Sequence, residues 1–451
     1  MSLLIHDATV VTVDAERRVF APGAVYVEGS RIVDVGPSDA VRGRRPAADR
    51  VVDGHRKLVL PGFVSSHTHV GYTIFRGRAE DAGLGCVTGQ YFPMAAILSR
   101  EERLAVGALP YAELLRSGVT TVLEMEEDAD VYAPYVETLG IRSAMGVMIL
   151  DVEVEGLRRA SYRFDPAIGD VQLHQAVEFA ERWHGGAGGR ITALMTPNMV
   201  LSSSPAQLRA VRRAAARLGL RLSIHLGWGP AEAAATRQLY GKPPVRFLVD
   251  EGFLGPDVVV AHCYHIEEGD VELLARSGAA VAHCPLMNAV RGCIAPVQDL
   301  RRRGVTVSLG IDNMFADFFD VVRACVLVAR IRDRDAVTMP SMEAVELATM
   351  GGARALGMER EIGSLEAGKR ADLVVVDYRA FGLTPTLEPV QNLVYHAHAR
   401  DVEMVLVDGA VVVDDRRLRT VDTGALADRA QAAAEAAWGR FAARHGGYMA
   451  S

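Results

Sequence analysis

Between residues 61 and 365, short apolar runs alternate with longer segments in which apolar residues recur every three or four positions. The short runs predict buried β-strands, and the longer segments predict amphipathic helices. Strands that alternate with helices are typical of a parallel sheet with crossover helices, and about eight such units predict a (β/α)₈ TIM barrel of the α/β class. A doubly wound open sheet is the alternative. The predicted strands are FVSSH, VTTVLEM, IRSAMGVMI, ITALMT, LRLSIH, PDVVVAH, GAAVAHC and VTVSLGID.

Both ends of the chain have a different pattern. Residues 1–60 contain short segments rich in β-branched residues with turns between them, and residues 366–420 return to this pattern. Such segments predict strands rather than helices. We therefore expect the two ends to form one β domain, with the barrel over residues 61–365 between them. Residues 421–451 include an alanine-rich stretch that predicts a C-terminal helix.

Composition narrows the functional class. The chain carries a formal net charge of -7, without the concentrated basic face that binds nucleic acid. No run of about 18 apolar residues is present, so neither a membrane-spanning segment nor an export signal is expected. The five cysteines lack CxxC spacing and indicate neither a disulfide framework nor a thiolate zinc site. These features predict a cytoplasmic enzyme that acts on a small molecule.

Several histidines lie where the predicted strands end. His67 and His69 close the first strand, and because side chains alternate along a strand, the two imidazoles point to the same side. In a parallel barrel, the C-terminal ends of all strands meet at the rim that carries the active site. The residues that this rule gathers at the rim are His67, His69, His225, His262, His265, His283 and Asp312.

Imidazoles together with a carboxylate are suitable ligands for a divalent cation such as zinc, with one position left for water. A single histidine at a strand end is more often a structural residue, and HxH alone is a weak signal. The joint pattern, in register with the strands, favours a metal site. A metal there would lower the pKa of its bound water toward neutrality.

Eight motifs occur in a fixed order: LPGFVSSHTH, LLRSGVTTV, SIHLGWGPAE, VVAHCYH, VAHCPLMN, SLGID, IGSLEAGKRADLVVVD and VEMVLVDGAVVV. In this combination the chain resembles the amidohydrolase superfamily, in the branch that contains triazine chlorohydrolases, guanine deaminase and S-adenosylhomocysteine deaminase. The resemblance covers nearly the whole chain. It implies a barrel inserted in a small composite β-sandwich domain, in agreement with the pattern of the two ends.

The resemblance also implies a metal site with four ligands, which are His67, His69, His225 and Asp312. Binuclear members of the superfamily bridge two metals with a carboxylated lysine on the fourth barrel strand. Here that strand is ITALMTP, and none of the three lysines of the chain lies near it. We therefore expect one divalent metal per chain, zinc or alternatively iron. A homodimer is a further expectation from the family.

Catalytic and substrate-binding roles follow from the same resemblance. Asp312 would take the proton from the metal-bound water, and His262 would orient that water or stabilise developing negative charge. His283 and Asn288 match the stretch that lines the substrate pocket. The loops after the strands set specificity in such barrels, and they offer Arg76, Gln90, Tyr91 and His265 as further candidates.

The sequence departs from this branch at Trp228. The histidine on the fifth strand normally opens an HxxE motif, whose glutamate shuttles protons to a ring nitrogen of the substrate; here Trp228 takes the place of that glutamate. One interpretation is that Glu232 moves into the site, although it matches a different position, at the start of the next helix. The other is that the reaction needs no such carboxylate and that the indole stacks on a planar substrate.

These observations lead to three functional hypotheses. The first is a mononuclear hydrolase in which metal hydroxide attacks an sp² carbon of a nitrogen heterocycle, as an aminohydrolase (deaminase) or a dechlorinase-like enzyme. The second is hydrolysis of a cyclic amide, imide or amidine C–N bond, which the missing glutamate favours. The third is a binding or scaffold protein without catalysis, against which the intact ligand set argues.

Overall fold

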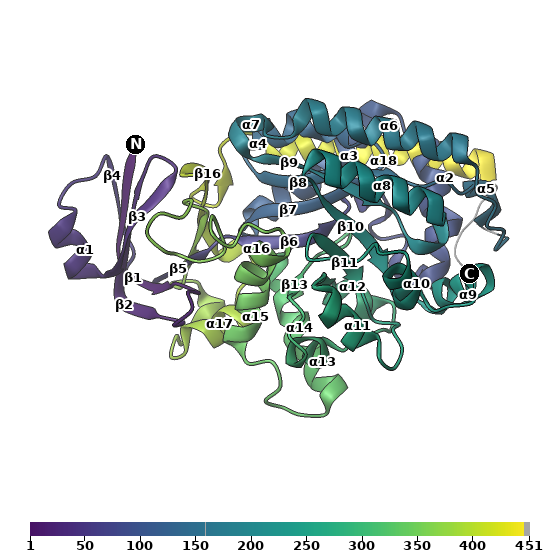
Figure 1. Cartoon of the computed structure of the whole chain (residues 1–451). Coiled ribbons are helices and arrows are strands. Elements are labelled where there is room, and N and C mark those ends of the chain that lie inside the picture. Colours follow the sequence, from purple (N-terminus) through teal and green to yellow (C-terminus); the bar gives the residue numbers. More distant parts are fainter. Residues whose placement is uncertain (158, 446–451) are drawn as a thin grey trace.

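Eight parallel strands from the middle of the chain form a barrel (Figure 1). The structure is a computed structural model, and it describes residues 1–157 and 159–445. Most barrel strands are buried along their whole length, as expected where helices cover the outside and side chains fill the inside. The strands are β6 (Phe63–Thr68), β7 (Val119–Glu126), β8 (Arg142–Ile149), β9 (Ile191–Pro197), β10 (Arg221–Leu226), β11 (Val258–His262), β12 (Ala280–His283) and β13 (Val307–Leu309).

The barrel closes between β6 and the segment that follows β13. A parallel bridge joins Thr68 to Asp312. The His69 N–H donates to the Asp312 carbonyl at 2.7 Å, and the Asp312 N–H donates to the His67 carbonyl at 3.1 Å. The closure therefore holds three of the four expected metal ligands against one another through the backbone.

Helices alternate with the barrel strands and lie on the outside of the barrel (Figure 1). In α8, the Ser204 side chain caps the N-terminus by accepting from Gln207 N–H, and Gly219 ends the helix in the left-handed conformation. The helices between and after the strands include α3 (Arg100–Arg116), α4 (Ala129–Leu139), α6 (Pro166–Trp183), α8 (Pro205–Leu218), α9 (Pro230–Tyr240), α10 (Pro244–Asp250), α11 (Asp270–Ser277), α12 (Pro285–Val290), α13 (Val297–Arg302), α14 (Phe318–Asp333), α15 (Ser341–Glu346) and α16 (Gly352–Ala355).

The two ends of the chain contribute to one nine-stranded sheet with its own apolar core. β5 joins the ends, since it pairs with β1 on one side and with β14 on the other. The predicted α/β fold, a (β/α)₈ barrel with a composite β domain, is confirmed. The strands of this sheet are β1 (Ser2–Val11), β2 (Val19–Glu28), β3 (Arg31–Pro37), β4 (Arg50–Asp53), β5 (Lys57–Pro61), β14 (Leu373–Asp377), β15 (Val402–Val407), β16 (Ala410–Asp414) and β17 (Arg417–Leu418).

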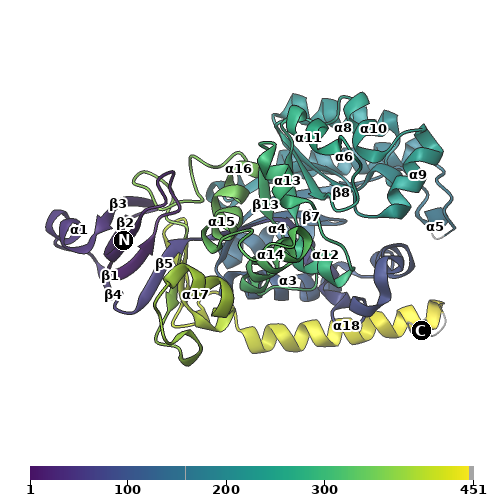
Figure 2. The ribbon, with the colours of Figure 1, turned by 90° about the horizontal axis from the view of Figure 1, so that it is seen from below.

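A long helix, α18 (Thr423–His445), follows the last strand and packs along α3 (Figure 2). Its Trp438 donates from Nε1 to the Ile74 carbonyl at 2.9 Å, so it reaches the segment that follows the first barrel strand. Residues 446–451 of the predicted helix lie outside the described part of the chain. Among the described helices, none has the length and apolar character needed to cross a membrane.

Candidate metal centre

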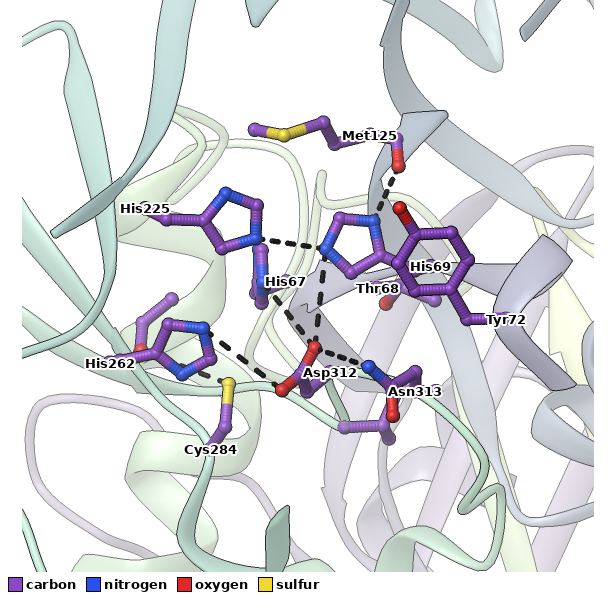
Figure 3. A network of polar contacts seen from close by, with 12 residues as sticks. His67, Thr68, His69, Tyr72, Met125, His225, His262, Cys284, Asp312 and Asn313 are labelled. Carbon is purple, nitrogen blue, oxygen red and sulfur yellow. Dashed lines mark hydrogen bonds and ion pairs between the residues drawn. The ribbon is translucent and has the colours of Figure 1, made fainter. Parts of the chain in front are cut away.

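Four histidines and one aspartate converge at the C-terminal rim of the barrel (Figure 3). His67 and His69 come from β6, and His225 lies on β10. One ring nitrogen of each of these three lies within 4.8 Å of the others, and the same limit holds among His67, His262 and Asp312. The pleat of β6 accounts for the convergence of His67 and His69, as the alternation of side chains predicts.

The hydrogen bonds of two histidines fix their tautomers. His69 donates from Nδ1 to the Met125 carbonyl at 2.6 Å, and His225 donates from Nδ1 to the Asn198 carbonyl at 2.5 Å. Their Nε2 atoms consequently carry lone pairs, yet these atoms lie only 3.0 Å apart. Two facing lone pairs repel each other unless a cation lies between them, and a carbonyl behind each imidazole is the usual support of a metal-binding histidine.

His67 provides a second observation that fits a metal. Its side chain is fully buried, and neither ring nitrogen has a hydrogen-bond partner among the described residues. An imidazole without any partner is costly to bury, whereas a metal ligand needs a free nitrogen. Burial lowers the pKa of His67, His69 and His225, which keeps their rings in the neutral form that binds a metal.

Asp312 divides its two oxygens between different neighbours. Oδ1 lies 3.8 Å from His67 Nε2 and 4.0 Å from His69 Nε2, and Asn313 Nδ2 donates to it at 3.0 Å. Oδ2 lies 4.0 Å from His262 Nε2. One oxygen can therefore face a metal while the other faces His262, which suits a carboxylate that both binds a metal and accepts a proton.

The backbone at this rim is strained. Asp312 has a φ of 65° and His262 a φ of 83°, both in the left-handed region that residues with a Cβ rarely adopt. Such conformations cost about 1–3 kcal/mol each, and they persist where the surrounding structure imposes them. The hydrogen bonds that close the barrel impose the left-handed conformation on Asp312. His262 Nδ1 donates to Asn288 Oδ1 at 3.3 Å, which directs Nε2 toward Asp312.

A cavity opens beside these residues. Tyr91 and Trp228, two of the expected substrate contacts, lie in its wall. Asn288 supports His262 from behind instead of lining the cavity. The lining residues are His69, Tyr72, Val87, Tyr91, Phe92, Met148, Asn198, Met199, His225, Trp228, His262, Arg291, Asp312 and Asn313.

Four other expected substrate contacts do not line this cavity. The Arg76 guanidinium donates to Glu113 and to the Met314 carbonyl, and it lies in a different hollow beside α18. His265 is exposed, while Gln90 is buried. His283 is also buried, and burial lowers its pKa to about 3. Strand periodicity located the loops of these residues but could not supply the direction of each side chain.

Glu232 does not replace the missing HxxE carboxylate. It is fully buried in the first turn of α9 and accepts a hydrogen bond at Oε2 from the Trp228 N–H at 3.0 Å. It is not among the cavity-lining residues, and burial raises its pKa to about 8. Glu232 therefore positions the loop after β10. Gly227, with a φ of 64°, lets that loop turn against Ile266, where a Cβ would lie 2.8 Å from its side chain.

Sequence reasoning missed one charged group in the cavity. Arg291, which directly follows α12, donates from Nη1 to Asp312 Oδ2 at 3.2 Å and has only 7% of its side chain exposed. Its position three residues after Asn288 in an otherwise uncharged stretch is the sequence signal that could have identified it. Asn198 and Tyr72 were also missed, because they follow strand ends without carrying a recognisable motif.

Comparisons with known proteins agree with this geometry. The amidohydrolase family model matches residues 58–412. The chain belongs to the amidohydrolase family. This amidohydrolase is 34% identical over 95% of its length to a 5-methylthioadenosine/S-adenosylhomocysteine deaminase of Pelotomaculum thermopropionicum, of which 97% is covered. It is 33% identical to a 5'-deoxyadenosine deaminase of Methanosarcina barkeri, with 96% of this chain and 98% of the relative covered.

Solved structures of similar proteins have the same fold. An adenosine deaminase from Xanthomonas campestris with bound zinc superposes with a TM-score of 0.88 at 29% identity, over 97% of this amidohydrolase and 98% of that chain. A triazine hydrolase of Arthrobacter aurescens superposes with a TM-score of 0.86 at 23% identity, over 96% and 99% of the two chains. The second likeness shows the fold alone. The family model and the two deaminase relatives confirm the superfamily and branch that the motifs indicated.

Proposed function

We propose that this amidohydrolase is a mononuclear zinc enzyme that removes a group, most simply an amino group, from an sp² carbon of a nitrogen heterocycle. The observation that carries the proposal is the convergence of His67, His69, His225 and Asp312 beside a cavity that Trp228 also lines. The deaminase names of relatives at 33% and 34% identity support it. β9, the fourth barrel strand, contains no lysine, which supports one metal rather than two.

The residues divide the work of this reaction between them. Zinc held by the four ligands would supply a water whose pKa is lowered toward neutrality. Asp312 would accept a proton from that water at Oδ2 and return it to the departing nitrogen. His262, with Nε2 directed toward Asp312 by Asn288, would accept a hydrogen bond from that water and orient it for attack.

Trp228 favours a second candidate reaction, the hydrolysis of a cyclic amide, imide or amidine C–N bond. Deaminases of this branch use the HxxE glutamate to protonate a ring nitrogen, and here neither Trp228 nor the sequestered Glu232 offers a carboxylate to the cavity. Ring opening needs a proton only on the departing nitrogen, which Asp312 could deliver. The two reactions share every other residue of the site.

Product analysis tests the proposal. Zinc-loaded protein is incubated with aminopurines, aminopterins, aminotriazines and cyclic amides in isotope-labelled water, and ammonia and product masses are measured. We expect ammonia together with exchange of the amino group for one labelled oxygen. Addition of a whole water without ammonia would establish ring opening instead. Absence of both reactions in protein with bound zinc would favour a binding or scaffold role.

The indole of Trp228 is expected to contribute to substrate binding. Replacing it with alanine should weaken binding by about 1–3 kcal/mol, because a stacked and buried aromatic surface is lost. Zinc content should stay unchanged, since Trp228 is not a ligand. Steady-state kinetics on the native substrate, with elemental analysis in parallel, measures both effects.

The matched variant Trp228→Glu restores the HxxE spacing. It should not enhance the native reaction, although weak deamination of purines, pterins or triazines would agree with the proposal. If Trp228→Ala leaves all kinetic constants unchanged, the indole does not contact the substrate and conventional deaminase chemistry becomes the better account.

We further propose that the enzyme is a cytoplasmic homodimer. All five cysteines are free, which suits a reducing compartment. The dimer is an expectation from the family. Light scattering of the purified protein measures its mass in solution, and a monomeric mass would reject the dimer.

A further inference from the structure

Among the described residues that line the cavity, Arg291 is the one with a cationic side chain. Its guanidinium is almost entirely withdrawn from bulk solvent, with 7% of the side chain exposed. Within the described part of the chain, its hydrogen bonding is confined to one contact, from Nη1 to Asp312 Oδ2 at 3.2 Å. A guanidinium has five N–H groups in a planar fork. Arg291 therefore retains donors that a ligand in the cavity can use.

The charges around the cavity leave Arg291 without a carboxylate of its own. Asp312 is the one acidic residue in the described lining, and it is also an expected metal ligand. Tyr91 and Tyr264, the phenols near the guanidinium, are neutral groups. With zinc in the site, one carboxylate faces a divalent cation and a guanidinium together. An anionic ligand would restore the balance, because buried charges are stable only when paired.

Most of the other unpaired groups in the wall of the cavity also favour such a ligand. Trp228 Nε1 and Asn198 Nδ2 are buried donors, and neither has a hydrogen-bond partner among the residues that the structure describes. The unpaired Tyr91 hydroxyl can donate as well, whereas Asn313 Oδ1 is an unpaired acceptor. Unpaired donors therefore predominate, which is complementary to a ligand rich in oxygen or nitrogen acceptors.

The position of Arg291 limits where the negative charge can lie on the ligand. Asp312 Oδ2, to which Arg291 donates, is also 4.0 Å from His262 Nε2. The guanidinium thus lies beside the centre at which the reaction is proposed to occur. A charge on a long flexible tail would lie elsewhere, whereas a charge on the ring itself would meet Arg291.

We propose that Arg291 binds an anionic oxygen on the substrate ring, so that the substrate is a planar nitrogen heterocycle with a carboxylate or an ionised oxo group near the reacting carbon. This inference rests on the proposed function for the identity of the reacting centre. The inference makes Arg291 a specificity-determining residue. The residues on either side of it in the sequence are uncharged.

Matched ligands test the inference on the full-length, zinc-loaded protein. Calorimetry measures the dissociation constants of uracil-6-carboxylate and of its neutral carboxamide, and of barbiturate and neutral uracil. The first pair reports on a carboxylate and the second on an ionised oxo group. We expect the wild type to prefer at least one anion by on the order of tenfold to a hundredfold, the usual contribution of a hydrogen bond between charged groups. No preference, or no binding of either anion, overturns the inference.

Variants of Arg291 separate charge recognition from a structural role. Arg291→Met should abolish the preference while zinc content stays the same, and Arg291→Lys should restore part of it. Arg303→Met, which removes a 60%-exposed guanidinium paired with Glu272, is the matched control and should keep the full preference. If Arg291→Met weakens anionic and neutral ligands equally, Arg291 only positions Asp312 and the inference is wrong. Arg291→Lys decides the question if the methionine variant does not fold.

The same preparations distinguish this inference from the proposed function. Binding is measured without turnover, and ammonia release or ring opening is measured separately. A preference for anions that depends on Arg291 in protein without hydrolytic activity would reject the proposed function and retain the anion site. Hydrolysis of neutral heterocycles without any preference for anionic ligands would retain the proposed function and reject the anion site.

Discussion

Replacing His67 with alanine is expected to remove zinc and hydrolytic activity together. His67 is fully buried, and both of its ring nitrogens lack partners among the described residues, so a metal is the interaction that its position provides for. Its ring lies 4.7 Å from that of His69 and 4.7 Å from that of His225, between centroids. Without it, two imidazoles and one carboxylate remain, and the affinity for zinc should fall to background. Elemental analysis after dialysis against free zinc measures the loss.

A matched control is available on β12. His283 is also a buried histidine at a strand end, and neither of its ring nitrogens has a partner in the described structure. His283→Ala should keep about one equivalent of zinc, because His283 is not part of the converging set. Loss of zinc from both variants would mean that any cavity at the rim disturbs the site. Retention of zinc by His67→Ala would reject the ligand assignment.

Thermal unfolding gives an independent measure of the same change. A ligand that binds only the folded state stabilises it, by about 2.7 kcal/mol at a free concentration one hundred times the dissociation constant. The melting temperature of the wild type should therefore rise when zinc is added to metal-free protein. The melting temperature of His67→Ala should not respond to zinc, whatever stability the substitution itself costs.

The fold could be predicted from the sequence because its elements have unambiguous patterns. β8 and β11 are buried along their whole length and read as largely apolar runs, which parallel strands with two covered faces require. The HxH spacing of His67 and His69 predicted that both side chains lie on the same face of β6, at its C-terminal end. The union of the two ends of the chain was predictable from their common β pattern, although the pairing of β5 with both β1 and β14 was not.

The walls of the cavity were less predictable, since they come from loops without periodicity. Arg76 and His265 follow strand ends as expected, yet the guanidinium of Arg76 is bound to Glu113 and His265 is exposed. Arg291 is the opposite case, because a residue without a motif lies against Asp312. Which carboxylates line the cavity also depended on tertiary contacts. Only the structure shows that Glu232 accepts a hydrogen bond from the Trp228 N–H and does not line the cavity.

Exchanging Asp312 for asparagine should separate metal binding from catalysis. The amide oxygen can still coordinate zinc, but the side chain can no longer accept a proton. It also has one oxygen where the carboxylate has two, and in the wild type these oxygens serve His67 and His69 on one side and His262 and Arg291 on the other. We expect zinc to remain at weaker affinity while turnover falls by about 10³-fold or more, since both proton transfer and charge stabilisation are affected.

Two further variants provide reference values for zinc content and rate. His262→Ala should keep its zinc and lose about 10² to 10³ in rate, as expected for one electrostatic or general-base group. Asp299→Asn, at a 47%-exposed carboxylate on α13, should change neither zinc content nor rate. Elemental analysis and steady-state hydrolysis are measured on all three proteins. Unchanged turnover in Asp312→Asn would remove Asp312 from proton transfer, and complete loss of zinc would show that coordination is its main role, because the amide then fails where the carboxylate binds.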